Sequence, residues 1–160
     1  MTRIKKTTFA HPAWEARDSG IHGRGAFCVQ SIAAGSLIAP YEGKLLTEEE
    51  ASDLYGDGAG HTFLFALSDG GVIDGGQGGN DARFINHGCE PNVEADEVDS
   101  RIEIRAMRDI ELGEELLLDY RLVAEGEQAE AAHPCRCGAP TCRGTLVWRE
   151  RRTSEVLEEA

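Results

Sequence analysis

The chain has 160 residues, of which 41% are hydrophobic and 28% are charged, and its formal net charge is −13 at pH 7. These proportions favour a folded domain with one hydrophobic core and exclude a disordered chain. The acidic balance argues against sequence-independent nucleic-acid binding, which needs Lys and Arg to neutralise phosphates. It favours encounter with basic partners, although a charge that only keeps the protein in solution is an equal alternative.

The sequence carries no sign of membrane insertion or export. No apolar run approaches the roughly 20 residues that span a bilayer, and residues 1–14 lack the apolar segment of a signal peptide. We therefore expect an intracellular protein without membrane association, in a reducing compartment. Many Ala and Gly residues and few Lys residues favour a G+C-rich genome, and with it the cytoplasm of a bacterium.

The hydrophobic pattern of the first third predicts short strands and one helix. Residues 24–41 are typical of two strands around a turn at residues 33–36. Thr47 and Glu50 form a capping box, which predicts a short helix that ends near Tyr55.

The pattern of short strands continues through the rest of the chain. Residues 61–76 predict a hairpin in which Asp69 and Gly70 supply the positive φ angles of a tight turn. Residues 101–107 alternate as a half-buried strand, and residues 109–120 predict a turn and a further strand.

The C-terminal part is more polar. Residues 124–134 predict a loop, and the charged tail from Arg149 is expected to be frayed or helical. All elements together favour a mainly β domain with few short helices.

Four of the five cysteines form a pattern typical of a metal site. The spacing C-x-C-x4-C supplies three thiols and the central segment a fourth, which gives Cys89, Cys135, Cys137 and Cys142. Because adjacent C-x-C thiols cannot close a regular disulfide, and four thiolates suit tetrahedral zinc, we expect a structural zinc. Zinc would stabilise the C-terminal segment against the central one. The alternative is four unrelated buried thiols. We expect Cys28 to be a core residue.

Four stretches, taken in order, resemble one protein family. They are "GIHGRGAF" (20–27), "RFINHGCEPN" (83–92), "GEELLLDY" (113–120) and "CRCGAPTCRG" (135–144). Together they are similar to the SET-domain protein lysine methyltransferases with a zinc-binding post-SET segment, in particular to the trithorax-like branch. The resemblance covers roughly residues 15–148.

The resemblance implies a β-clip-like SET fold of small curved sheets with a pseudoknot. In it the segment around Asn86 and His87 crosses the segment that ends at Tyr120. Threaded crossings are rare and need specific contacts, which the polar side chains of residues 83–92 would provide. The implied organisation is an N-terminal extension (1–14), a SET domain (15–121), a linker loop (122–134), a post-SET zinc-binding segment (135–150) and a charged tail (151–160).

The activity that the resemblance implies is transfer of methyl groups from S-adenosylmethionine to a lysine ε-amine in a histone-like or other basic protein. Two other hypotheses stay open. One is a SET-like module that binds the cofactor or a basic peptide without turnover, and the other is a zinc-ribbon nucleic-acid protein. The charge of −13 argues against direct contact with nucleic acid. In a eukaryote the resemblance implies a nuclear, chromatin-associated protein. The sequence does not indicate an oligomeric state.

The resemblance also assigns roles to individual residues. Tyr120 matches the catalytic tyrosine, and Tyr41 is expected near the active site. Phe63 and Leu118 would line the substrate channel. An apolar channel and an adjacent sulfonium would lower the pKa of the substrate lysine from about 10.4, which gives the neutral amine that attacks. The expected cofactor-binding residues are His22, Gly23, Arg24, Gly25, Phe63, Arg83, Phe84, Asn86 and His87.

The chain departs from the family pattern at several positions. Gly88 stands where the family usually has Ser, and Phe63 where it usually has Tyr. Leu118 replaces the usual Phe or Tyr, and because it leaves more room beside the amine we expect multiple methylation. A threonine takes the place of the aromatic residue that packs on the adenine, so that role would pass to Leu146 or Trp148.

Overall fold

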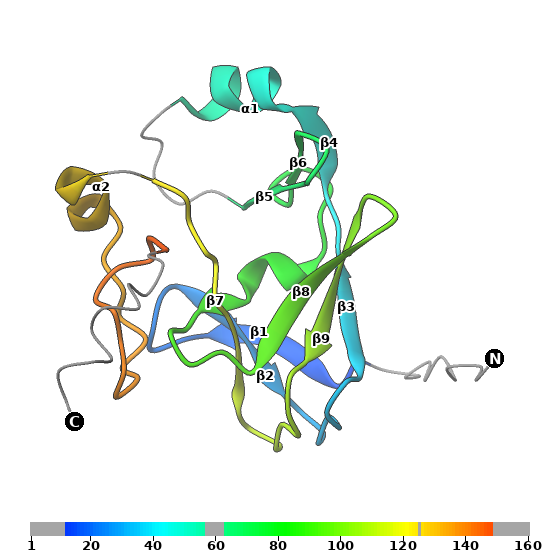
Figure 1. Cartoon of the computed structure of the whole chain (residues 1–160). Helices are drawn as coiled ribbons and strands as arrows, with labels where there is room; N and C mark the ends of the chain where they lie inside the picture. The colour runs from blue at the N-terminus through cyan, green and yellow to red at the C-terminus, as the bar shows by residue number, and fades with distance from the viewer. Residues whose placement is uncertain (1–11, 57–62, 125, 149–160) are drawn as a thin grey trace, which may run out of the picture.

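Figure 1 shows the computed structural model, which describes residues 12–56, 63–124 and 126–148. Its strands form two sheets: a larger one that holds the core, and a smaller one that lies with α1 at the top of the view. The mainly β fold with few short helices is the one predicted. In these three segments no helix is long and apolar enough to cross a membrane.

The larger sheet has the strand order β1-β2-β10-β8-β9-β3, and β7 pairs with β10 beside this path. The first of these strands was not predicted, and it begins just before the expected start of the main domain at residue 15. The strands of this sheet are β1 (Trp14–Asp18), β2 (Arg24–Cys28), β3 (Leu37–Tyr41), β7 (Asn86–His87), β8 (Val93–Val98), β9 (Arg101–Ala106) and β10 (Glu115–Leu118).

Strand β10 joins the two halves of the larger sheet. It pairs antiparallel with β2 and parallel with β7 and β8. The two segments that we expected to cross therefore lie side by side. Asn92 completes their pairing: its Oδ1 accepts the Leu117 N–H at 2.8 Å, and its Nδ2 donates to the Glu115 carbonyl at 2.8 Å. This amide is only 3% exposed, and its hydrogen bonds replace those of a regular strand partner.

Alternation along β9 builds the core. Ile102, Ile104 and Ala106 are buried and the residues between them are half-buried, which confirms the strand predicted for residues 101–107. The same core contains Cys28, which is 2% exposed, as expected of a core residue.

The smaller sheet has the order β4-β6-β5 and carries α1. The Thr47 Oγ1 accepts the Glu50 N–H at 3.1 Å, and the Glu50 carboxylate accepts the Thr47 N–H at 2.8 Å. This confirms the capping box, and the helix ends at Tyr55 as predicted. The bounds of these elements are β4 (Lys44–Thr47), α1 (Glu48–Tyr55), β5 (Leu64–Ala66) and β6 (Gly71–Asp74).

The β5–β6 hairpin was predicted, but the prediction for its turn was wrong in detail. Gly70 has a φ of +89°, whereas Asp69 does not adopt a positive φ. The Gly70 N–H donates to the Leu67 carbonyl at 3.2 Å, so the loop has three residues and only the last is left-handed. Asp69 acts through its carboxylate, which accepts the Gly71 N–H at 2.9 Å.

The loop predicted for residues 124–134 is wrong in part, because it contains a short helix, α2 (Glu127–Ala132). No residue of α2 is buried, so the sequence has no apolar periodicity there that would indicate a helix. Beyond α2 the chain returns to the main domain, where Val147 pairs with Leu122. The charged tail expected from Arg149 lies outside the described residues.

Candidate active site and cysteine cluster

A pocket of about 290 Å³ opens between the two sheets. Its lining is mainly apolar and aromatic. Four residues that the sequence assigned to catalysis or to the substrate channel lie in it together: Tyr41, Phe63, Leu118 and Tyr120. Glu97 of β8 connects the larger sheet to the β5–β6 hairpin of the smaller one. Its carboxylate accepts hydrogen bonds from the Ser68 N–H at 2.9 Å and from the Ser68 hydroxyl at 2.8 Å.

Tyr120 follows the end of β10, and its hydroxyl is turned inward. The hydroxyl donates to the Ile85 carbonyl at 2.7 Å, although 36% of the whole residue stays exposed. Burial of the phenol, with smaller contributions from Tyr41 and the Glu115 carboxylate, raises the pKa of Tyr120. The phenol is therefore neutral at physiological pH, and its oxygen can still accept a hydrogen bond.

Tyr41, at the end of β3, is held in the same way. Its hydroxyl donates to the Phe63 carbonyl at 2.7 Å. Burial and the nearby Asp74 carboxylate raise the pKa of Tyr41, against a smaller opposite effect of Arg83. The pocket thus has two neutral phenols, each using its proton on a backbone carbonyl.

A loop between β1 and β2 is fixed by the side chain of Asn86. The Asn86 Nδ2 donates to the carbonyls of His22 at 3.1 Å and Arg24 at 3.0 Å, and it lies 3.0 Å from the Glu115 Oε1. The Ser19 hydroxyl donates to the same carboxylate oxygen at 2.8 Å. The loop of residues 19–25, counted with the first two residues of β2, contains four of the expected cofactor-binding residues and is therefore held to β7 and β10.

Glu115 and Ser19 were not among the predicted site residues. A Cβ at Gly25 would lie 2.1 Å from the Glu115 Oε1, so the glycine of the "HGRG" stretch makes room for this carboxylate. Glu115 is the first residue of β10 and has no buried position directly before it, so the sequence carries no pattern that indicates this role.

Two of the expected cofactor-binding arginines stack on one aromatic ring. The Arg24 guanidinium lies 4.8 Å and the Arg83 guanidinium 4.7 Å from the centre of the Phe84 ring. Phe84 also meets the edge of Phe63 at 6.0 Å between ring centres. These contacts join the loop of residues 19–25 to the pocket.

Residues 84–86 form a wall between the loop and the pocket. The carbonyl of Ile85 accepts the Tyr120 hydroxyl on the pocket side, whereas the next side chain, Asn86, holds the loop. A molecule bound at the loop and another bound in the pocket would therefore approach each other beside this short stretch of backbone.

His87 was expected at the cofactor, but its side chain is engaged elsewhere. The Nδ1 accepts the Tyr120 N–H at 3.1 Å, and the Nε2 lies 3.4 Å from the Cys89 Sγ. The ring is 4% exposed and meets the Tyr120 ring edge-on. The imidazole thus lies between Tyr120 and the cysteines, and a contact of His87 with the cofactor stays a prediction.

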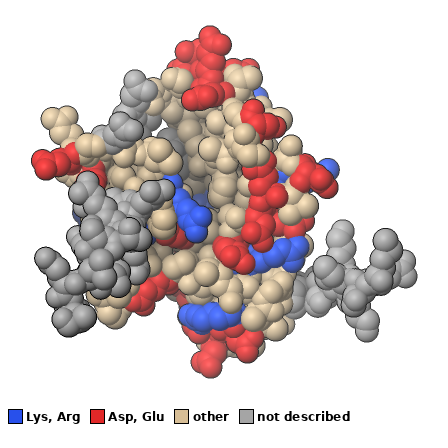
Figure 2. All heavy atoms as spheres, viewed as in Figure 1, with Lys and Arg blue, Asp and Glu red and all other residues tan. Residues whose placement is uncertain are grey.

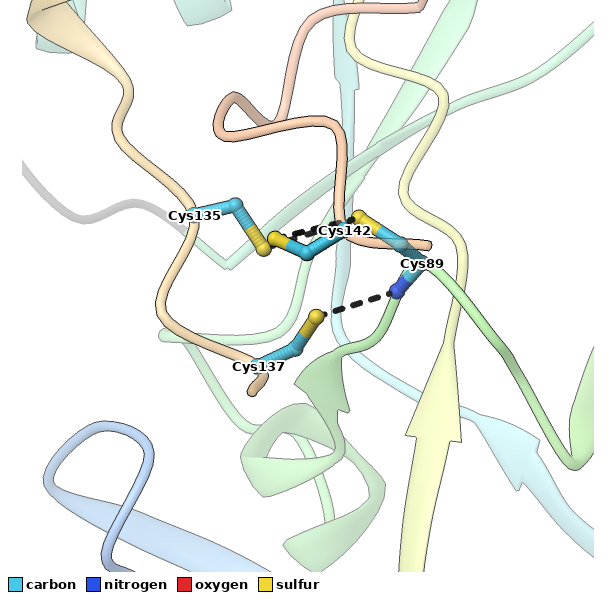
Figure 3. A group of neighbouring side chains, drawn as sticks. All are labelled: Cys89, Cys135, Cys137 and Cys142. Atoms are coloured by element: carbon cyan, nitrogen blue, oxygen red, sulfur yellow. Dashed lines mark hydrogen bonds between the residues drawn. The ribbon is translucent and has the colours of Figure 1, made fainter. Parts of the chain in front are cut away.

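The four cysteines expected to bind zinc converge, as Figure 3 shows. Their sulfur atoms all lie within 4.8 Å of one another, and the Cys89 Sγ is 3.7 Å from that of Cys135 and 3.9 Å from that of Cys142. A tetrahedral zinc with bonds of about 2.3 Å to sulfur would set the sulfurs about 3.8 Å apart. The donor set and its spacing therefore fit zinc.

Backbone N–H groups support this cluster. Arg143 donates to the Cys89 Sγ at 3.4 Å, Gly144 to the Cys142 Sγ at 3.4 Å, and Cys89 to the Cys137 Sγ at 3.5 Å. Such donors stabilise thiolate charge around a metal.

Acidic side chains gather on the face shown in Figure 2. They cover α1 at the top and form a column over the strands to the right of the centre. Exposed acidic residues along β8 and its turn are Glu94, Asp96, Glu97 and Asp99.

The family model of the SET domain matches residues 23–121. The chain belongs to the SET-domain family. Its similar proteins include the histone-lysine N-methyltransferase trithorax of Drosophila virilis, 41% identical over 135 residues, and the human histone-lysine N-methyltransferase 2B, 42% identical over 136 residues. The histone-lysine N-methyltransferase of Kluyveromyces lactis named as specific for H3 lysine 4 is 39% identical over 152 residues.

These alignments cover 80–90% of this SET chain but only 3–14% of the relatives, so the chain spans a small part of their length. A solved structure, ctPRC2 in an autoinhibited conformation bound to S-adenosylmethionine, superposes with a TM-score of 0.62 and 28% identity over 68% of this chain and 15% of that one. The family resemblance and the SET fold are thereby confirmed. The relatives named here are eukaryotic and do not support the preference for a bacterial source.

Proposed function

We propose that the chain is a protein-lysine N-methyltransferase that uses S-adenosylmethionine. The observation that carries the proposal is the pairing of two adjacent sites: an apolar pocket with two neutral phenols, and the loop of residues 19–25 behind the wall of residues 84–86. The names of the relatives, which are histone-lysine N-methyltransferases, support the same reaction.

The pocket is suited to the side chain of a lysine. Its apolar lining disfavours an ammonium ion and lowers the pKa of the entering amine from about 10.4, so the neutral, nucleophilic form becomes accessible. The oxygens of Tyr41 and Tyr120 would accept the N–H groups of that amine and turn its lone pair past the Ile85 carbonyl, toward the place where the methyl group of the cofactor would lie. Both phenols keep their protons, because burial raises their pKa values.

S-adenosylmethionine supplies an activated methyl group on a sulfonium. The loop of residues 19–25 would hold it, with Asn86 fixing the loop and Arg24 and Arg83 flanking Phe84. The backbone around Ile85 then directs the transfer toward the pocket and excludes water from it. Glu115 supports the cofactor site, because its carboxylate accepts a hydrogen bond from Ser19 of this loop and contacts Asn86.

The substrate in this proposal is a basic protein segment, such as a histone tail. The column of acidic side chains in Figure 2 and the exposed acids of β8 would attract such a segment to the face shown there. In a eukaryotic cell the protein would act in the nucleus, on chromatin.

Zinc in this proposal is structural. Cys89, Cys135, Cys137 and Cys142 would hold it and so fix the C-terminal segment against the crossing of β7 and β10. All four ligands are protein thiols, which leaves no open coordination position for catalysis.

A methylation screen tests the proposal. Purified protein with labelled S-adenosylmethionine is applied to an array of lysine-containing histone and non-histone peptides. We expect label on lysine, and a loss of at least about a hundredfold in Tyr120→Phe, because the amine loses an orienting acceptor.

Tyr55→Phe is the matched control. Its hydroxyl donates to Asp74 at 2.5 Å in the smaller sheet and does not line the pocket, so this variant should keep most of the activity. Binding of S-adenosylmethionine without transfer to any peptide would contradict the proposal and favour a module that only binds. Salt-dependent binding of DNA, with no transfer, would favour the nucleic-acid hypothesis.

A further inference from the structure

Tyr120 lies just beyond the part of β10 that the sheet fixes. The strand ends at Leu118, and the Tyr120 N–H donates to the side-chain ring of His87 instead of to the backbone of a neighbouring strand. The next residue, Arg121, has a φ of +48°, which is unfavourable for a residue with a side chain. Side-chain contacts must therefore define where the pocket tyrosine lies.

Asp119 provides such a contact. Its Oδ1 accepts the Arg121 N–H at 3.1 Å and so stabilises the turn after Tyr120. Its two oxygens also accept two hydrogen bonds from Arg143, at 2.9 and 3.0 Å. The side chains of Asp119 and Arg143 are only 15% and 24% exposed, and a bidentate pair of this kind fixes geometry as well as contributing energy.

Arg143 belongs to the cysteine cluster through its backbone. It follows Cys142 in the chain, and its N–H donates to the Cys89 Sγ at 3.4 Å. Its Nε is buried without a hydrogen-bond partner, the one such side-chain nitrogen or oxygen among the residues that the structure describes. An unpaired buried donor costs stability, so the guanidinium is held in place by its two hydrogen bonds to Asp119 and by the Trp148 ring, whose centre is 5.5 Å away.

His87 makes a second link between the same two sites. Its ring lies between the Cys89 Sγ, at 3.4 Å, and the Tyr120 N–H, at 3.1 Å. The Asp119 Oδ1 is 3.7 Å from the Nδ1 of His87. The two side chains that fix the segment of Tyr120, those of His87 and Arg143, therefore belong to residues that contact Cys89: His87 through its ring and Arg143 through its backbone N–H.

We propose that Asp119 and Arg143 are positioning residues, which hold the Tyr120 hydroxyl in the pocket from the cysteine cluster. The proposal rests on the methyltransferase function proposed above. If the proposal holds, the orientation of Tyr120 depends on whether the loop that carries Arg143 is folded. The cysteines of this loop do not line the pocket themselves.

Arg143→Gln tests the proposal, because it removes the ion pair and keeps a side chain of similar length. We expect kcat to fall about tenfold or more while the KM for S-adenosylmethionine stays within about twofold, since a small displacement of a catalytic group lowers the rate of the chemical step. Arg143→Lys, which keeps the charge but not the bidentate geometry, should recover part of kcat.

Hydrogen–deuterium exchange gives a readout that needs no turnover. In Arg143→Gln the peptide that contains residues 118–122 should exchange several-fold faster, because its N–H groups lose fixed acceptors. The control is Arg108→Gln, which breaks a similar two-bond pair with Glu114, at 2.9 and 3.3 Å, on the exposed surface. This control should change neither kcat nor the exchange of residues 118–122.

Unchanged kcat and unchanged exchange in Arg143→Gln would overturn the proposal. Loss of bound zinc from this variant, measured beside the wild type, would also overturn it, because Arg143 would then serve the cluster and not the tyrosine. If the wild type methylates no peptide, the proposed function fails, and the exchange of residues 118–122 still decides whether Arg143 holds this segment.

Discussion

At the scale of single residues, the hydrogen bonds of the two tyrosine hydroxyls decide what the pocket can bind. Tyr41 and Tyr120 each donate to a backbone carbonyl, so each presents an oxygen that accepts hydrogen bonds. Burial raises both pKa values, which keeps the phenols neutral and avoids a phenolate that would bind the ammonium form of lysine. Leu118 beside them offers neither a hydrogen bond nor a ring.

Leu118→Tyr should therefore change the product more than the rate. Leu118 leaves more space in the pocket than a Phe or Tyr would, and we therefore expect dimethyl- and trimethyl-lysine in long incubations. A tyrosine ring at this position fills that room, so monomethyl-lysine should become the main product. Mass spectrometry of a peptide with one lysine measures the distribution; a wild type that stops at one methyl would contradict the expectation.

The burial of the Cys28 thiol can be tested by how the stability of the protein changes with pH. Burial, together with the Glu114 carboxylate, raises the pKa of this thiol from 9.0 to about 11. The unfolded chain therefore loses this proton before the folded one does, and the free energy of unfolding falls as pH rises from 9 toward 11. The thiol should account for about 2 kcal/mol of that fall.

The measurement is urea unfolding of the wild type and Cys28→Ala at pH 8 and pH 11. The variant lacks the titrating group, so its loss of stability over this interval should be smaller by about 2 kcal/mol. Equal losses in the two proteins would mean that the thiol is not protected from solvent.

At the scale of elements, Gly88, which follows β7, lets this segment lie close to Leu117 of β10. The Gly88 N–H donates to the Leu118 carbonyl at 3.1 Å, and a Cβ at this position would lie 2.8 Å from the Cβ of Leu117. Leu117 therefore leaves no space for the serine that the family usually has at the position of Gly88.

Gly88→Ser should destabilise the fold by about 1–3 kcal/mol, because the added side chain overlaps Leu117. Combining it with Leu117→Gly, which also lacks the Cβ, removes the overlap, so the double variant should be more stable than the sum of the two single effects by about 1 kcal/mol. Chemical unfolding of the four proteins in this cycle measures the difference. Strict additivity would show that the two side chains do not compete for space.

The sequence predicts local features of these elements well. The capping box of α1 and the alternation of β9 depend on residues close together in the chain, and both were predicted. Helix α2 was missed because none of its residues is buried. The prediction for the turn after Leu67 was wrong for Asp69, because only Gly70 has a positive φ and Asp69 contributes its carboxylate.

The candidate site divides in the same way. The cysteine cluster was found because three of its thiols have a diagnostic spacing. The partners of Asn86 and of Asp119 could not be predicted, because Glu115 and Arg143 reach them only after the chain has crossed itself. Residues that act by holding others carry no pattern of their own in the sequence.

At the scale of the whole molecule, the cysteine cluster connects the C-terminal segment to the pocket. Cys89 follows β7, whereas the other three thiols come from the loop after α2, and the same loop carries Arg143. Order in this loop is therefore required for the position of Tyr120, which lies in a different part of the chain.

Cys137→Ser should lower both the metal content and the activity, because a site with three thiolates binds zinc more weakly. A chelator should reproduce this effect in the wild type, and added zinc should reverse it. Cys28→Ala is the control, since this thiol lies in the core and outside the cluster. Full activity in Cys137→Ser would show that the cluster does not support the pocket.

The most direct test of the central claim is a crystal structure with S-adenosylhomocysteine and a lysine peptide bound together. Our account predicts the sulfur atom at the loop of residues 19–25 and the lysine in the pocket, with its nitrogen within hydrogen-bond distance of the Tyr120 hydroxyl. The sulfur and the nitrogen should face each other beside residues 84–86, with no backbone atom between them, because the methyl group passes directly from one to the other. A cofactor bound within the pocket itself, or a lysine bound away from Tyr120, would contradict the account.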